Sequence, residues 1–182
     1  MKVKDNNSSN IIFITGGTKS GKSEFAEFLG RKIKKITYIA LSDSMPEDIN
    51  WQKKILKHRK RRPKEWMLIE PNNLINTLKS EMGPILIDSI GGFIMESINK
   101  NDEVWENMIY LLLDLLVMRK KSPLIVGEQV GWSLVSEYEI VNKYIERLGD
   151  LQKRITKISK ENWLTLNGRA IKLDNISIEI PT

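Results

Sequence analysis

The amino-acid sequence predicts an α/β fold in which a mostly parallel β-sheet carries helices on both faces. Short apolar runs, several of them rich in β-branched residues, alternate along the chain with longer amphipathic segments. This alternation is typical of strands that are buried on both faces and connected by helices. The chain has 182 residues, of which 41% are hydrophobic, so it is long enough to bury one core. We expect a single domain over residues 11–182, preceded by a disordered polar tail at residues 1–10.

Each expected element follows from its pattern of apolar residues. The predicted strands are residues 11–15, 36–40, 66–70, 85–88, 124–126 and 163–166. The predicted helices place apolar residues at three- and four-residue steps, which gives a helix one buried face. They are residues 22–35, 48–60, 72–81, 102–120 and 138–159. The third of these begins after Pro71 and ends before the pair Gly83-Pro84, and both features mark helix boundaries.

Composition excludes several classes of protein. The chain has no cysteine, so disulfides and thiolate metal sites are ruled out. No apolar stretch approaches the roughly 18 residues that a membrane span requires, and the polar N-terminus lacks the features of a secretory signal. We therefore expect a cytoplasmic protein without a membrane span. The net charge of +6 favours anionic partners, which include both nucleotides and nucleic acids.

An eight-residue motif follows the first predicted strand. Its residues are Gly16, Gly17, Thr18, Lys19, Ser20, Gly21, Lys22 and Ser23. They match the pattern G-x-x-x-x-G-K-[ST] and lie between an apolar strand and an amphipathic helix, which is the context that supports the motif. Its glycines let the backbone wrap around phosphate oxygens, and the helix N-terminus presents unpaired N–H groups to them. The sequence therefore predicts a P-loop, and a glycine-rich turn with a chance lysine is the alternative.

Two side chains are expected to complete the triphosphate site. Lys22 would neutralise the β- and γ-phosphates, and the hydroxyl of Ser23 would bind Mg²⁺. Asp88 ends the apolar run of residues 84–88, as the aspartate that holds Mg²⁺ through water does in P-loop proteins. A structural carboxylate at a strand end is the alternative for Asp88.

His58 is the chain's only histidine, and it lies in a basic run at residues 57–62. One interpretation is the solvated face of a basic helix. Another is a nucleophile, because neutral imidazole attacks phosphorus and forms a phosphoramidate that is displaced later. Neighbouring cations would keep more of the imidazole unprotonated and would gather nucleotide phosphates. Nucleic-acid binding through phosphate contacts is a third interpretation, but no recognition helix or aromatic platform accompanies the run.

A series of segments spaced along the chain resembles one known family. The most specific segment is His58-x-x-Arg61-Arg62-Pro63-x-x-Trp66-x-x-x-Glu70. The others are residues 15–26, 38–40, 86–88, Val130-Gly131, Gly149 in the last long helix, and residues 164–168. With these residues the chain resembles, from Ile11 to about Leu173, the bifunctional adenosylcobinamide kinase / adenosylcobinamide-phosphate guanylyltransferase family of cobalamin biosynthesis.

The resemblance implies a RecA-like sheet, a homotrimer and two reactions. A nucleoside triphosphate, GTP or ATP with Mg²⁺, first phosphorylates the hydroxyl of the aminopropanol arm of adenosylcobinamide. GTP then transfers GMP onto that phosphate through a guanylylated histidine. By position, His58 matches this histidine, Lys22 and Ser23 match the phosphate and Mg²⁺ ligands, and Glu70 matches a carboxylate at the nucleotide site. Arg61 and Arg62 are expected to bind nucleotide phosphates.

Some positions differ from the family pattern. Ser89-Ile90-Gly91 replaces Cys-Leu-Thr, Glu128-Gln129 replaces Asn-Glu, Ser136 replaces a proline, and Gln152-Lys153 replaces Asn-Gln. Glutamine at position 129 has no general-base capacity, and Glu128 is not expected to substitute because neighbouring strand residues face opposite sides. The alternatives are a diverged member that retains one activity or takes a modified corrinoid, and another P-loop small-molecule kinase.

Overall fold

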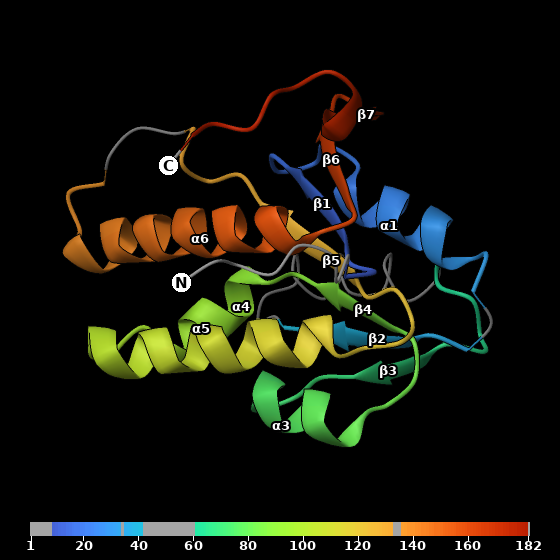
Figure 1. Ribbon diagram of the computed structural model, residues 1–182, viewed down its shortest axis with the longest axis horizontal. Coiled ribbons are helices and arrows are strands. Elements are labelled where there is room, and N and C mark those ends of the chain that lie inside the picture. The colour runs from blue at the N-terminus through green and yellow to red at the C-terminus, as the bar shows by residue number, and fades with distance from the viewer. Residues whose placement is uncertain (1–8, 34, 42–60, 133–135, 182) are drawn as a thin grey trace, which may run out of the picture.

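The computed structural model describes residues 9–33, 35–41, 61–132 and 136–181, which form a seven-stranded sheet with helices on both faces (Figure 1). The strands are β1 (Ile12–Gly16), β2 (Thr37–Ala40), β3 (Met67–Ile69), β4 (Ile85–Asp88), β5 (Leu124–Glu128), β6 (Glu161–Leu166) and β7 (Arg169–Lys172). The helices are α1 (Lys22–Gly30), α3 (Leu74–Ser80), α4 (Gly91–Ser97), α5 (Asp102–Val117), α6 (Glu139–Ile158) and the short 3-10 helix η1 (Leu173–Asn175). The predicted helix at residues 48–60 lies outside the described residues.

The strand order is β3-β2-β4-β5-β1-β6-β7, and every pair is parallel except the β6–β7 hairpin. The predicted mostly parallel sheet is therefore confirmed. One strand, β5, separates β1 from β4, which is the RecA-like arrangement of the P-loop strand and the strand that ends in Asp88. All six predicted strands are present, with ends shifted by one or two residues.

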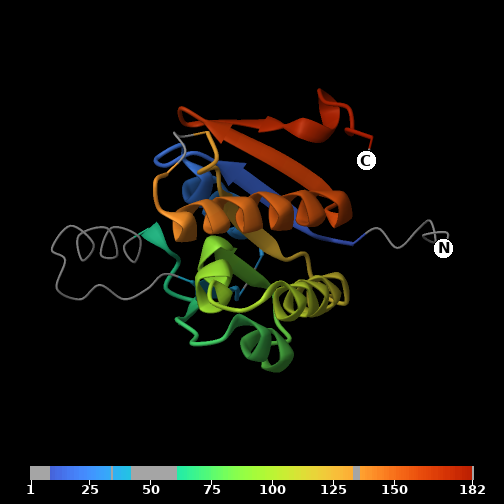
Figure 2. The same cartoon turned by 90° about the vertical axis from the view of Figure 1, so that its left-hand side faces the viewer.

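Helices lie on both faces of the sheet (Figure 2), and alternate side chains of the strands form one core with the helices of each face. Phe13, Ile87 and Ile125 pack on the face that is covered by α3, α4, α5 and α6. Ile14 and Val126 point to the opposite face, where they pack with Ala26 of α1. Strands with apolar residues at every position are required when both faces are covered, so the prediction of helices on both faces is confirmed.

Helix α4 and strand β7, as well as the short η1, were not expected from the sequence. Helix α4 opens with Gly91-Gly92, a pair that ordinarily marks a turn. A Cβ on Gly92 would collide with the carbonyl oxygen of Leu41 and lie 2.5 Å from the Leu41 Cβ, so this glycine is required by a close approach of the chain. Strand β7 follows the turn Asn167-Gly168, whose residues have φ values of 50° and 74°, as a tight hairpin needs.

Helix α1 ends earlier than expected. It was predicted to reach Lys35, but it stops at Gly30, and the following N–H groups of Lys32 and Ile33 bond to carbonyls three residues back. A Cβ on Gly30 would lie 2.7 Å from the ring of Trp66. The close contact between the end of the helix and this indole explains why position 30 is a glycine. The hydrogen bonds to carbonyls three residues back form a tighter turn than that of an α-helix, and this turn ends α1.

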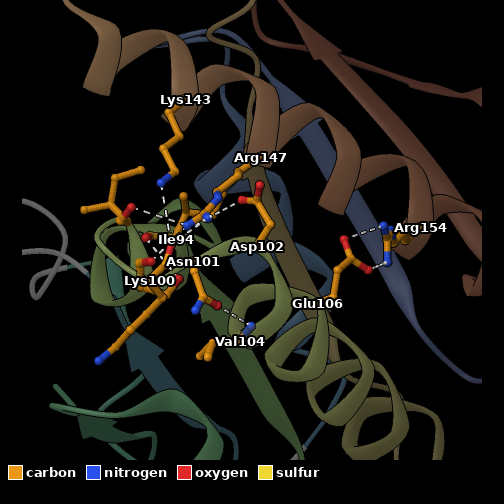
Figure 3. A network of polar contacts seen from close by, with 11 residues as sticks. Ile94, Lys100, Asn101, Asp102, Val104, Glu106, Lys143, Arg147 and Arg154 are labelled. Atoms are coloured by element: carbon orange, nitrogen blue, oxygen red, sulfur yellow. Dashed lines mark hydrogen bonds and ion pairs between the residues drawn. The ribbon is translucent and has the colours of Figure 1, made fainter.

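The connection between α4 and α5 is held by one buried arginine of α6, Arg147 (Figure 3). Its guanidinium donates hydrogen bonds to the carbonyls of Ser97 and Lys100, both at 2.9 Å, and to the Asp102 carboxylate at 3.0 Å. It also lies 4.9 Å from the centre of the Trp105 ring. The last carbonyls of a helix need partners, so this side chain joins the end of α4 to the start of α5.

We expect Arg147→Met to lower the free energy of unfolding by about 3 kcal/mol, because it leaves buried carbonyls without donors. Chemical denaturation measures this change. The matched control is Arg154→Met on the same helix, whose pairs with Glu106 (2.7 Å) and Asp150 (2.8 Å) are partly exposed (Figure 3). That variant should lose less than about 1 kcal/mol. Equal losses for the two variants would contradict the structural role given to Arg147.

Candidate functional site

The candidate site lies at the edge of the sheet formed by the carboxyl ends of the parallel strands. Strand β1 ends at Gly16, and the chain passes through residues 17–21 into α1, which begins at Lys22. Asp88 ends β4 at the same edge. Ligands of open α/β sheets bind at this edge, so the structure brings the predicted phosphate loop and the predicted metal ligand to one side of the molecule.

The loop conformation depends on glycine at two positions. Gly21, the residue before α1, has a φ of 99°, in the left-handed region that other residues avoid. A Cβ on Gly16 would lie 2.5 Å from the Thr165 carbonyl oxygen and 2.6 Å from the Ser20 Oγ. The N-cap residue of α1, Gly21, has no side chain to cap the helix, and among the described residues no side-chain cap bonds to its first N–H groups, which suits this end of the helix to an anion.

Strand β6 supports the loop from behind. The hydroxyls of Ser20 and Thr165 lie 2.8 Å apart, and the Gly168 N–H donates to the Ser20 carbonyl at 3.0 Å. Thr165 also donates to the Thr15 carbonyl at 3.2 Å. The sequence predicted the loop but not this support, because residues about 145 positions apart carry no local signal of their contact.

Lys22 and Lys19 occupy different surroundings within the loop. The Nζ of Lys22 donates to the Gly17 carbonyl at 3.2 Å and is partly buried, so its ammonium group lies against the start of the loop. Thr18 and Lys19 are exposed. Ser23, in the first turn of α1, is partly buried. An ammonium held against a loop of this kind is suited to bind the terminal phosphates of a nucleotide.

Asp88 is oriented by a buried tyrosine. The hydroxyl of Tyr38, on the neighbouring strand β2, donates to the Oδ2 of Asp88. Burial, and then the negative charge of Asp88, raise the pKa of Tyr38, so the phenol stays protonated and remains a donor. Because the second oxygen of Asp88 is not used by this bond, the carboxylate is able to bind Mg²⁺ or its water.

Arg61, the first residue of the described segment 61–132, is held against helix α1 by ion pairs. Its guanidinium forms ion pairs with Glu24 and Glu27, and the Glu27 pair measures 3.1 Å. Glu27 is only 3% exposed. Burial raises the pKa of Glu27, and Arg61 partly offsets this effect. A phosphate bound by Arg61 would have to compete with these two carboxylates.

Arg62, Glu70 and His58 complete the predicted set. The Arg62 guanidinium lies 3.5 Å from the centre of the Tyr38 ring, and so it belongs to the same group of side chains as Asp88. Glu70 is exposed after β3, and β2, β4 and β5 separate it from the P-loop strand, roughly 19 Å at ordinary strand spacing. His58 lies outside the described residues. The roles of all three stay predictions.

A polar network at the ends of β1 and β5 was not predicted. The Gln129 amide donates to the Thr15 hydroxyl at 2.9 Å and to the Gln152 Oε1 at 3.2 Å. Gln152 in turn donates to the Glu128 carbonyl at 2.7 Å. Glu128 itself accepts from the Ser89 hydroxyl, so neighbouring residues 128 and 129 have different partners, as strand geometry led us to expect.

The residues that the structure describes contain neither a cluster of metal-ligating side chains nor a helix able to span a membrane. Among them, no three His, Cys, Asp or Glu side chains gather closely enough to hold a metal ion. In the same part of the chain, no helix is both long and apolar enough to cross a membrane.

The fold and the loop together define an α/β protein of the P-loop class with a RecA-like sheet. The model of the cobinamide kinase / cobinamide phosphate guanyltransferase family matches residues 12–173. The chain belongs to this family.

Named relatives agree with the family match. Two proteins named bifunctional adenosylcobalamin biosynthesis protein CobU, from Escherichia coli and Salmonella typhimurium, are 22% and 25% identical, and each alignment covers 90% of this chain and 99% of the relative. The CobP protein of Pseudomonas aeruginosa is 26% identical, over 88% of this chain and 95% of that protein.

A solved structure from Pyrococcus horikoshii OT3 matches 96% of this chain and 93% of its own with a TM-score of 0.54. Its sequence identity of 9% means that the likeness concerns the fold alone.

Proposed function

We propose that this chain phosphorylates adenosylcobinamide and then transfers GMP from GTP to the resulting phosphate, giving adenosylcobinamide-GDP. The observation that carries the proposal is the P-loop at the carboxyl edge of the sheet, with Asp88 at the end of β4, in a chain of the cobinamide kinase and guanyltransferase family. A corrinoid is the proposed substrate, and GTP or ATP with Mg²⁺ supplies the phosphoryl group. A member that retains only one of the two activities is the alternative.

In the first reaction, the P-loop holds the triphosphate and Lys22 contacts its terminal phosphates. Backbone N–H groups at the start of α1 and the Lys22 ammonium balance the charge of the phosphates. Mg²⁺, bound through the Ser23 hydroxyl and Asp88, would neutralise charge that develops on the leaving phosphates. The acceptor hydroxyl oxygen attacks the γ-phosphorus, and the nucleoside diphosphate leaves.

In the second reaction, the His58 imidazole attacks the α-phosphorus of GTP. The new N–P bond replaces the α–β P–O bond, and pyrophosphate leaves. A phosphate oxygen of adenosylcobinamide phosphate then attacks the same phosphorus and breaks the N–P bond. The ion pairs of Arg61 with α1 support this assignment, because only three positions separate Arg61 from His58 in the sequence, at most about 11 Å of chain.

Product analysis tests the proposal. Purified protein is incubated with adenosylcobinamide, Mg²⁺ and ATP, then with GTP, and the corrinoids are separated and weighed by mass spectrometry. We expect adenosylcobinamide phosphate first and adenosylcobinamide-GDP after GTP is added. Only the first product would support the one-activity alternative, and neither product, with the protein folded, would refute the proposed function.

We also propose that the protein assembles as a homotrimer, as the family resemblance implies. Apolar side chains at the start of α6, including Tyr138 (64% exposed) and Ile140 (52% exposed), are available for such contacts. Sedimentation equilibrium gives the mass directly. A mass of 21.0 kDa at micromolar concentration would mean that the chain is a monomer.

A further inference from the structure

Glu128 lies at the carboxyl edge of the sheet, next to the first residue of the phosphate loop. It ends β5, the strand between the P-loop strand β1 and the Asp88 strand β4. In the register of the sheet, Glu128 is level with Gly16, the first residue of the P-loop, and two residues beyond the level of Asp88. Its side chain therefore begins at the sheet edge between the phosphate loop and the proposed metal ligand.

Two neutral donors hold the carboxylate of Glu128. The Ser89 hydroxyl donates to one oxygen, and the Gly91 N–H donates to the other at 3.3 Å. Ser89 lies between β4 and α4, and Gly91 is the first residue of α4, so this bond pattern turns the Glu128 side chain toward that connection. The two hydrogen bonds fix the direction of the carboxylate.

The hydroxyl of Tyr144, on α6, lies beside the same carboxylate. A Cβ on Gly91 would collide with the Tyr144 hydroxyl and lie 2.7 Å from the Glu128 Oε1, so glycine at this position lets the two groups meet. Burial, and then the charge of Glu128, raise the pKa of Tyr144, which keeps the phenol protonated. A carboxylate and a phenol side by side offer an acceptor and a donor to an incoming hydroxyl group.

The other carboxylates near the site already have partners. Glu27 and Glu24 pair with Arg61, and Asp88 accepts from Tyr38. Within the described part of the chain, the contacts of Glu128 are with neutral donors, and no Lys or Arg forms an ion pair with it. Gln129, its neighbour, has an amide that cannot accept a proton at neutral pH.

Contrary to the expectation from strand alternation that Glu128 would not substitute for a carboxylate at position 129, we propose that Glu128 is the general base of the phosphorylation step, a role that rests on the proposed function above. The acceptor hydroxyl donates a hydrogen bond to the Glu128 carboxylate and attacks the γ-phosphorus of the nucleotide. The O–H bond breaks and the proton passes to Glu128, while an O–P bond forms. The bond from the γ-phosphorus to the β–γ bridging oxygen breaks, and its electron pair leaves with the nucleoside diphosphate. Ser89 and Gly91 act as positioning groups for the base.

The test separates phosphorylation from the two activities that do not need this base. Glu128→Gln keeps the size of the side chain and one acceptor oxygen, for the Gly91 N–H, and the Ser89 hydroxyl can turn to accept from the new amide, but the side chain can no longer take a proton. We expect kcat for phosphorylation of adenosylcobinamide to fall about 100-fold, at the lower end of the usual contribution of a general base. KM for the corrinoid, the Kd for a non-hydrolysable GTP analogue and the rate of GMP adduct formation from GTP should stay near their wild-type values.

Two further variants distinguish a catalytic role of Glu128 from a purely structural one. Glu128→Ala should be inactive in phosphorylation and regain activity when formate is added, because a free carboxylate can occupy the vacated space and take the proton. Glu146→Gln, which changes an exposed carboxylate on α6 in the same way, is the matched control and should phosphorylate at the wild-type rate. Thermal unfolding midpoints of all variants show whether each is folded.

The outcomes are distinct. Near-wild-type phosphorylation by Glu128→Gln would overturn the base assignment while leaving the proposed function in place. Parallel losses of phosphorylation, nucleotide binding and adduct formation, without rescue by formate, would also overturn it and assign Glu128 to the structure of the α4 turn. A wild-type protein that forms no adenosylcobinamide phosphate would refute the proposed function itself.

Discussion

Lys22→Ala is expected to abolish measurable binding of GTP, with a rise in Kd of at least about 100-fold. Lys22 is the partly buried cation of the P-loop, and its ammonium lies against the start of the loop at 3.2 Å from the Gly17 carbonyl. Charge-assisted hydrogen bonds contribute about 1.5–3 kcal/mol each, and this side chain is placed to contact two phosphates, which together account for such a change in affinity. Isothermal titration with GTP and Mg²⁺ measures the effect.

The control for Lys22→Ala is Lys79→Ala, which removes an exposed cation from the last turn of α3 and should leave the Kd for GTP unchanged. Both variants should unfold at temperatures near that of the wild type, because neither ammonium supports the core. A Lys22→Ala protein that binds GTP with wild-type affinity would contradict the assignment of the phosphate loop.

His58→Ala is expected to stop GMP transfer and to spare phosphorylation. The imidazole is the proposed nucleophile toward the α-phosphorus, so its loss removes the covalent route, whereas the γ-phosphoryl transfer does not use it. Formation of adenosylcobinamide phosphate and adenosylcobinamide-GDP, followed separately, measures both effects. Lys57→Ala is the control, because it removes a neighbouring cation and keeps the imidazole. Formation of adenosylcobinamide-GDP by His58→Ala at the wild-type rate would rule out the covalent mechanism.

The core of the fold was predictable because its strands are apolar at every position. Residues 85–87 and 124–126 are all buried, and such runs indicate a parallel sheet covered on both faces without further information. Helix α4 was not predicted, because the pair Gly91-Gly92 is typical of a turn. These glycines are required by contacts with residues that are distant in the sequence. They allow Leu41, Glu128 and Tyr144 to approach the backbone, and no local sequence pattern predicts such a contact.

The candidate site was predictable only where its residues are contiguous. The loop from Gly16 to Ser23 is a continuous motif, and the structure places it between β1 and α1 as expected. The contact of Tyr38 with Asp88 joins residues fifty positions apart, and that of Ser20 with Thr165 joins residues 145 positions apart. Contacts of this kind depend on strand order, which the sequence alone did not supply.

The structure gives a reason for glutamine at position 129, where the family pattern has glutamate. Its amide donates to both Thr15 and Gln152, and a glutamate, which has no donor when ionised, would lose both bonds. The neutral side chain therefore suits the network that joins β1, β5 and α6. The carboxylate of this segment lies instead at Glu128, one residue earlier and on the side of the β4–α4 turn.

The most direct test of the proposed function is the intact mass of the protein after incubation with GTP and Mg²⁺, with His58→Ala treated alongside. The account predicts an acid-labile gain equal to one GMP on the wild-type chain and none on the variant. An unchanged wild-type mass, in a protein shown to bind GTP, would contradict the guanylylated-histidine mechanism, and so would an equal gain on both proteins.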